Sequence, residues 1–243
     1  MKSGRALALL ALVVVAAVGG YVVQRQLQPK STLTAVPATV ADAPPAGPSD
    51  GQPEPDAPPL QKPVPETLPG FSLPDRDGRP RTLADWSGRP LIVNYWATWC
   101  PPCIREIPLL TRLRQDYKTQ SLEVIGIAVD VRDDVLAFAA KRKLEYPLLI
   151  GEDEGLAAVT AVGMEPTFPF TIFADSKQRI VTLKVGELHE DEAKLILAEV
   201  VRLDAGQTDL AAARAVIDQG LKDLATQRAL SEEKSGKAAA ATG

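Results

Sequence analysis

The 243-residue sequence has few of the side chains that build metal sites and disulfide frameworks: two cysteines, one histidine and two methionines. Two cysteines cannot form the several bridges that hold a small secreted domain together. A structural zinc site needs about four ligands, and the one histidine, His189, lies far along the chain from both cysteines. We therefore expect no metal and no other cofactor, and we expect His189 at a solvated helix start.

Clusters of basic residues are also missing beyond the first few positions, and the formal net charge is -4. A surface that binds nucleic acid needs a concentrated positive patch. The composition therefore argues against a nucleic-acid partner.

An uncharged apolar run at residues 6–23 follows Lys2 and Arg5. As a helix it would span about 27 Å, close to the hydrocarbon thickness of a bilayer. Cleavable signal peptides usually have a shorter apolar region of about 7–15 residues, although cleavage after Gly19 is the alternative. The basic residues favour a cytoplasmic N-terminus. Residues 1–27 are therefore predicted to form a single-pass membrane anchor, with the rest of the chain outside the cytoplasm.

Residues 28–66 are rich in proline and alanine, with eleven prolines between positions 29 and 65. Proline removes a backbone donor and favours extended geometry, and such a segment buries too little apolar surface to fold alone. We expect a disordered spacer that would reach on the order of 100 Å when fully extended.

Residues 67–204 carry the pattern of an α/β domain. Runs of β-branched and aromatic residues predict strands at 91–97, 122–130, 170–175 and 179–186. Apolar residues spaced three and four apart predict helices at 100–118, 133–143 and 189–203. Turn dipeptides at 77–78 and 87–88 predict a small hairpin in the lead-in. Strands that alternate with helices imply a sheet covered by helices.

Residues 205–231 are predicted to form an additional amphipathic helix that begins at Thr208. Its apolar stripe needs a surface to pack on, either its own domain or a partner. Residues 232–243 are predicted to be a disordered tail.

Both cysteines lie in the segment NYWATWCPPCIREIP, residues 94–108. Cys100 falls between a predicted strand and a predicted helix, where the free N–H groups and the dipole of the helix stabilise a thiolate. Cys103 lies on the same helical face and can reach the Cys100 sulfur to form a disulfide. Pro101 and Pro102 fit a first turn in which a backbone donor is dispensable.

A loop this short makes a poor structural staple, so we predict a reversible dithiol in which Cys100 is the nucleophile and Cys103 the resolving thiol. The alternatives are a structural disulfide, two inert buried thiols or half of a metal site.

The segment YWATWCPPC resembles the active-site segment of the TlpA/ResA-like branch of membrane-tethered thioredoxin-fold proteins. The lead-in FSLPDRDGRPRTLADWSGRP, Pro108 and the later PFTIFAD share the resemblance, which covers roughly residues 68–203. It implies a thioredoxin fold, with a central mixed sheet flanked by helices. It also implies a cis peptide between Phe168 and Pro169, rather than at Pro166, and a Phe168 backbone that can pair with a bound peptide.

The resemblance further implies that Glu106, three residues after Cys103, activates the resolving thiol. The alternative is an acid that is favoured near a helix start by the dipole alone. Asn94 stands where ordinary cytosolic thioredoxins have a buried aspartate, so a proton relay at that position is absent. Trp99 either shields the sulfur or only packs. The residues expected to contact substrate are Trp99, Pro101, Pro102, Phe168 and Pro169.

The expected function is an extracytoplasmic thiol-disulfide oxidoreductase that reduces protein disulfides. The resemblance implies an anchor in a bacterial inner membrane with the catalytic domain in the periplasm. It also implies disulfide-containing clients outside the cytoplasm and a membrane electron donor of the DsbD type. Within this class, the alternative is a dedicated thiol reductase for apocytochrome c, in cytochrome c maturation, or for the assembly of an oxidase copper site. A non-catalytic module that binds a client or a metal is the alternative from another class.

Overall fold

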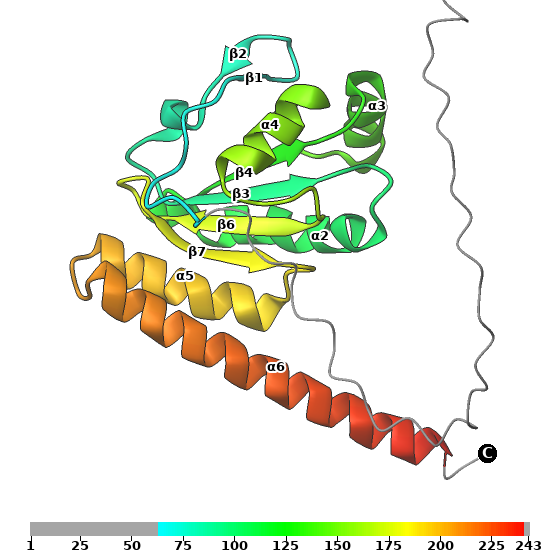
Figure 1. The fold of residues 1–243 in the computed structure, drawn as a ribbon, viewed down its shortest axis with the longest axis vertical. Coiled ribbons are helices and arrows are strands. Elements are labelled where there is room, and N and C mark those ends of the chain that lie inside the picture. The colour runs from blue at the N-terminus through cyan, green and yellow to red at the C-terminus, as the bar shows by residue number, and fades with distance from the viewer. Residues whose placement is uncertain (1–62, 241–243) are drawn as a thin grey trace, which may run out of the picture. The chain divides into compact units, whose positions relative to one another are not determined.

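The computed structural model describes residues 63–240, which form a sheet with helices on both faces (Figure 1). The predicted anchor at 1–27 and most of the predicted spacer, residues 28–62, lie outside the described residues, as do residues 241–243. Within 63–240, no helix is both long and apolar enough to cross a bilayer.

The central sheet has five strands in the order β5-β4-β3-β6-β7. Their bounds are Leu91–Trp96 (β3), Glu123–Ala128 (β4), Leu148–Ile150 (β5), Phe170–Ala174 (β6) and Ile180–Val185 (β7). The β3–β4 and β4–β5 pairs are parallel, whereas the β3–β6 and β6–β7 pairs are antiparallel. The four strands predicted from the sequence are present, and the expected mixed sheet of the thioredoxin fold is confirmed.

Strand β3 lies in the middle of the sheet, and all six of its residues are buried. Successive side chains of a strand point to opposite faces. Ile92 and Trp96 accordingly belong to one hydrophobic cluster, and Val93 and Tyr95 to the other. The carboxyl end of this strand leads directly to Cys100.

Helices cover both faces of the sheet. On one face lie α2 (Pro101–Asp116), α3 (Arg132–Arg142) and α5 (Glu190–Asp204), which bury Leu110, Val135 and Ile196 in a shared cluster. On the other face, α4 (Asp153–Ala161) packs with the lead-in segment. A short 3-10 helix, η2 (Lys118–Gln120), follows α2.

The lead-in contains a short antiparallel hairpin, as predicted, formed by β1 (Leu73–Pro74) and β2 (Pro80–Arg81). Gly78 in its turn has a φ of +80°, which a residue with a side chain rarely adopts. The 3-10 helix η1 (Leu83–Trp86) follows and buries its two end residues.

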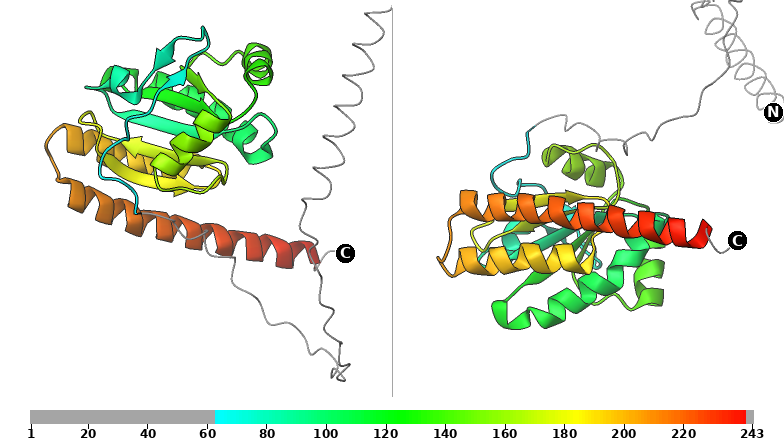
Figure 2. Two further views of the ribbon diagram at one scale, coloured as in Figure 1. Left: turned by 45° about the horizontal axis from the view of Figure 1, so that its top comes forward. Right: turned by 90° about the horizontal axis from the view of Figure 1, so that it is seen from below.

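The C-terminal helix, α6 (Leu210–Ala240), runs beside α5 (Figures 1 and 2). Ala213 and Ile217 are fully buried, so this helix packs on its own domain. A Cβ atom at Gly220 would lie 2.6 Å from Cδ2 of Leu195 on α5. The missing side chain therefore allows the two helices to approach closely.

The predicted end of this helix near residue 231, and the disordered tail, are wrong for residues 232–240, where α6 continues. The final residues are rich in alanine, which has the highest helix propensity. Extending an existing helix also costs less free energy than starting a new one.

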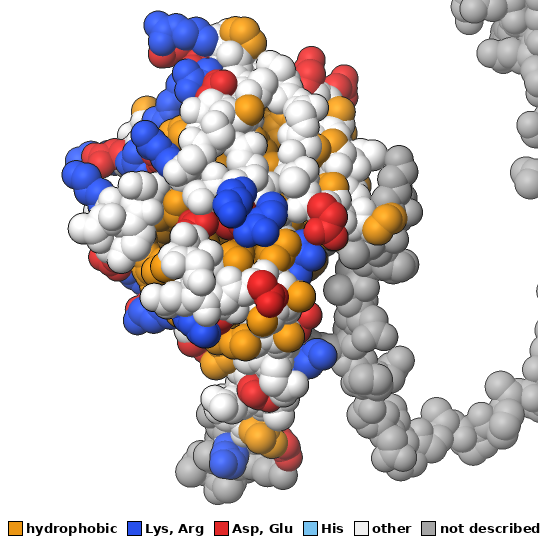
Figure 3. All heavy atoms as spheres, turned by 90° about the vertical axis from the view of Figure 1, so that its left-hand side faces the viewer, with side chains coloured by type: hydrophobic (Ala, Val, Ile, Leu, Met, Phe, Trp, Pro, Cys, Tyr) orange, Lys and Arg blue, Asp and Glu red, His pale blue; other side chains and the backbone are white. Residues whose placement is uncertain are grey.

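Charged side chains of both signs lie on one face of the domain. On the face drawn in Figure 3, Lys and Arg side chains lie among Asp and Glu side chains. Exposed ion pairs such as Arg112–Glu190 also connect α2 to the start of α5. Exposed pairs of this kind contribute little to stability.

Candidate active site

The loop after β3 is held by the neighbouring strand. The amide of Val129 donates to the carbonyl of Trp96 at 2.9 Å. The amide and hydroxyl of Thr98 donate to one carboxylate oxygen of Asp130, at 2.8 and 2.6 Å. Asp130 is buried just beyond the end of β4, and its other oxygen accepts from Val131 N–H. The residues immediately before Cys100 are therefore fixed by a carboxylate that the sequence reasoning missed.

Cys100 is the N-cap residue of α2, and its sulfur accepts a hydrogen bond from Cys103 N–H at 3.3 Å. Pro101 and Pro102 occupy the first helical positions, as expected, because the amide donors there have no partner within the helix. Cys100 and Cys103 form a disulfide with an S–S distance of 2.00 Å. Cys103 is fully buried, whereas Cys100 is 3% exposed.

The rings of Trp99 and Phe168 lie together beside the loop that leads to Cys100. The peptide bond between Phe168 and Pro169 is cis, as the resemblance implied, and no other cis bond occurs among residues 63–240. The Trp99 ring meets the Phe168 ring edge to face, with centroids 6.3 Å apart. Trp99 is 66% exposed, so most of its ring faces solvent rather than the core. This contact places the cis peptide next to the segment that carries Cys100.

Glu106 lies one helical turn after Cys103, and only 1% of its surface is exposed. One of its carboxylate oxygens accepts from the Asn94 amide at 2.7 Å, and the other from Leu188 N–H at 2.8 Å. Burial raises the pKa of Glu106 to about 7, and these two hydrogen bonds only partly oppose that effect. A buried carboxyl group that changes its protonation state near neutral pH is thus placed one turn from the inner cysteine.

Asn94 links this carboxyl group to the sheet. Its amide nitrogen also donates to the Thr171 hydroxyl at 2.9 Å, across the β3–β6 pair. Asn94 is fully buried, and its carbonyl oxygen has no hydrogen-bond partner among the described residues. An asparagine cannot titrate, so Asn94 orients Glu106 without exchanging a proton.

His189 is the N-cap residue of α5, close to its predicted place at a helix start. Its backbone N–H donates to Glu192 Oε2 at 3.0 Å, a contact that belongs to helix capping. Within the described part of the chain, no group of three or more His, Cys, Asp or Glu side chains could hold a metal ion.

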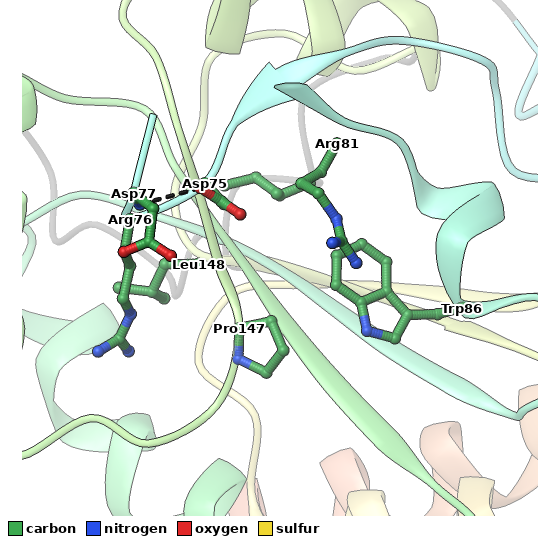
Figure 4. A pocket seen from close by; sticks show the side chains of 8 residues that line it. Asp75, Arg76, Asp77, Arg81, Trp86, Pro147 and Leu148 are labelled. Atoms are coloured by element: carbon green, nitrogen blue, oxygen red, sulfur yellow. Dashed lines mark hydrogen bonds between the residues drawn. The ribbon is translucent and has the colours of Figure 1, made fainter. Parts of the chain in front are cut away.

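Two surface cavities accompany these features. One of about 310 Å³ lies between the β1–β2 hairpin and β5 (Figure 4), where the Arg81 guanidinium lies 4.9 Å from the centre of the Trp86 ring. Its lining holds neither cysteine, so we do not assign it to the disulfide chemistry. The other, of about 300 Å³, lies between α2 and α3 and is lined by Ile104 and Pro108, close after Cys103.

Comparisons with known proteins agree with this geometry. The sequence pattern of the AhpC/TSA family matches residues 64–183. The thiol-disulfide oxidoreductase ResA of Geobacillus thermodenitrificans is 30% identical over 138 residues, which are 56% of this chain and 78% of that protein. ResA of Halalkalibacterium halodurans is 33% identical over 121 residues, or 49% of this chain and 67% of that protein.

A solved structure from Neisseria meningitidis, described as a thioredoxin, has a TM-score of 0.51 and 27% identity, covering 56% of this chain and 91% of that one. The fold, the position of the two cysteines and the two ResA relatives lead to one conclusion. The chain belongs to the ResA-like thiol-disulfide oxidoreductases, which have the thioredoxin fold.

Proposed function

We propose that this oxidoreductase reduces protein disulfides outside the cytoplasm, held at the membrane by residues 1–27. The observation that carries the proposed mechanism is the buried Glu106 carboxyl, which lies one turn beyond the buried Cys103. A buried thiol cannot attack until it loses its proton, and a nearby base can accept that proton. The reaction then has two steps.

In the first step, the Cys100 thiolate attacks one sulfur of a client disulfide. A bond forms between Cys100 and the client, the client disulfide breaks, and one client sulfur leaves as a thiolate that takes a proton from water. The N-terminal end of α2 stabilises the attacking thiolate through its dipole and its free amide groups.

In the second step, Cys103 gives its proton to the Glu106 carboxylate and attacks the Cys100 sulfur. The Cys100–Cys103 disulfide forms, the mixed disulfide breaks, and the second client sulfur leaves with the proton that Glu106 held. The client gains two electrons and two protons, and the protein ends in the disulfide form of the structure.

Glu106 suits this role because a general base works best when its pKa lies near the working pH. Its pKa of about 7 leaves a large fraction ionised at neutral pH. The hydrogen bonds from Asn94 and Leu188 also hold both oxygens in place, so the carboxyl need not reorient before it accepts a proton.

The client is proposed to bind as an extended segment along Phe168, beside the cis peptide, with the exposed Trp99 ring against its side chains. After each turnover the disulfide must be reduced again, which the periplasm does not do by itself. A membrane donor of the DsbD type is the proposed source of these two electrons.

The experiment that tests this proposal is a Cys103→Ala variant expressed in its native membrane. Without the resolving thiol, client proteins should stay linked to Cys100 and be released by a reducing agent. The Cys100→Ala/Cys103→Ala variant is the matched control and should trap none. If Cys103→Ala also traps none, the protein is better described as a non-catalytic binding module.

The trapped clients also separate a general reductase from one dedicated to apocytochrome c or to a copper-site assembly factor. The reduction potential gives the direction of the reaction. A value near the thioredoxin figure of about -270 mV supports a reductase, whereas a value near about -120 mV indicates an oxidase.

A further inference from the structure

The backbone that holds Glu106 belongs to the turn between β7 and α5. The Leu188 amide donates to Glu106, and Leu188 is 2% exposed. The next amide, that of His189, donates to Glu192 in the first turn of α5. Consecutive amides of one short segment thus bind two different buried carboxylates, so the position of one carboxylate constrains the position of the other.

Glu192 is itself 2% exposed, and its remaining oxygen faces two cations. Arg228 Nη1 lies 3.2 Å from Glu192 Oε1, and Lys184 Nζ lies 3.7 Å from the same atom. A buried carboxylate that loses its partner destabilises its surroundings strongly. The two cations therefore hold the Glu192 carboxylate in place.

Arg228 comes from α6, which lies beyond the 64–183 segment that matches the family pattern. Its other terminal nitrogen pairs with Asp191 at 3.2 Å, so this one side chain spans two acids at the start of α5. The close contact between Gly220 and Leu195 sets how α6 lies on α5. The C-terminal helix thereby reaches the segment that holds Glu106.

We propose that Arg228 is a positioning residue for the second step of the reaction. It neutralises Glu192, which fixes the Leu188–His189 segment and through it the Glu106 carboxyl. This inference rests on the proposed role of Glu106. It adds the C-terminal helix to the parts of the chain that determine how fast Cys103 releases the client.

The charged groups around Glu106 indicate how its pKa should change when Arg228 is removed. Asn94 from β3 and Leu188 N–H stabilise the carboxylate by hydrogen bonds, and Lys184 from β7 stabilises it by its charge. Glu187 opposes ionisation of Glu106, and Tyr146, before β5, also interacts with it. Without Arg228, Lys184 would be the remaining described cation at Glu192 and would be drawn toward that acid. Glu106 would then lose positive charge, and its pKa would rise.

The test uses the reduced protein and 5,5′-dithiobis(2-nitrobenzoate), which reports each step as one released coloured thiolate. The first phase is the attack by Cys100, and the second is the release of the mixed disulfide by Cys103. Arg228→Met should slow the second phase about two- to fivefold at pH 7, as for the loss of one partly exposed ion pair. The first phase should stay unchanged.

The pH profile separates this role from a purely structural one. If the pKa of Glu106 has risen, Arg228→Met should lose less of the second-phase rate above pH 9, because Glu106 is then ionised in both the variant and the parent. Arg228→Lys should restore most of the rate because it keeps a cation at Glu192. Arg214→Met is the matched control on α6, since Arg214 contacts Glu66 and the Ile180 carbonyl instead.

The inference is overturned if Arg228→Met leaves the second phase and its pH profile unchanged, or if Arg214→Met slows it equally. Glu106→Gln distinguishes the two proposals. If Glu106→Gln slows the second phase and Arg228→Met does not, only the inference about Arg228 fails. If Glu106→Gln leaves that phase unchanged, the proposed role of Glu106 fails as well.

Discussion

Replacing Glu106 with glutamine should remove a large pH dependence from the free energy of unfolding. Burial raises the pKa of Glu106 from 4.5 to about 7. Between these two values the folded protein keeps a proton that the unfolded chain has lost, so stability falls as the pH rises. The stabilisation that comes from this retained proton is fully present below about pH 4.5 and is lost above about pH 7. At 1.36 kcal/mol per pKa unit, its size is about 3 kcal/mol.

Glutamine changes this balance in two separable ways. It cannot ionise, so the pH-dependent part disappears. It also offers one acceptor oxygen in place of two, and one of the hydrogen bonds from Asn94 or Leu188 is lost. That loss costs about 1 kcal/mol at every pH. The buried carboxyl is therefore reported by the way the stability difference between Glu106→Gln and the parent changes with pH. The part of the difference that is constant with pH reports the lost hydrogen bond.

The assay is urea unfolding of the oxidised protein, followed by tryptophan fluorescence at several pH values between 4.5 and 8. The stability of Glu106→Gln relative to the parent should rise by about 3 kcal/mol across this range. Glu154→Gln, an exposed change on α4, is the control. A relative stability of Glu106→Gln that stays constant over the range would refute the reasoning.

Three other changes have defined outcomes. Trp99→Ala removes a ring that is 66% exposed, so the free energy of unfolding should change by less than about 0.5 kcal/mol. In steady-state assays, kcat/KM for a protein client should fall. An unchanged kcat/KM contradicts a client contact. Gly220→Val should cost about 1–3 kcal/mol in thermal unfolding through overpacking against Leu195, and Leu195→Ala should recover part of it. Asp130→Ala leaves the Thr98 amide without its acceptor and should cost about 1–3 kcal/mol in urea unfolding, with a smaller loss for Asp130→Asn, which keeps an acceptor.

The strand, the two cysteines and the start of α2 were predictable because local rules determine them. An apolar strand, prolines suited to a first helical turn and apolar spacing over 100–118 all agree with one another. The cis bond at Pro169 was predictable only through the family resemblance, since most X–Pro bonds are trans.

The surroundings of Glu106 could not be predicted in the same way. The sequence shows an acid one turn after Cys103, but its partner Leu188 lies 82 positions away. The contact of Asp130 with Thr98 was missed for a similar reason, although a signal existed. Carboxyl ends of neighbouring parallel strands meet at one edge of a sheet, and Asp130 follows the strand beside β3.

The central place of β3 has a consequence for how the enzyme tolerates repeated turnover. With a hydrogen-bonded neighbour on each side, the amide protons of this strand should exchange with deuterium only when the whole domain opens. The loop that carries Cys100 therefore follows a strand whose amides we expect to exchange slowly. We therefore expect the attachment of this loop to β3 to persist from one turnover to the next.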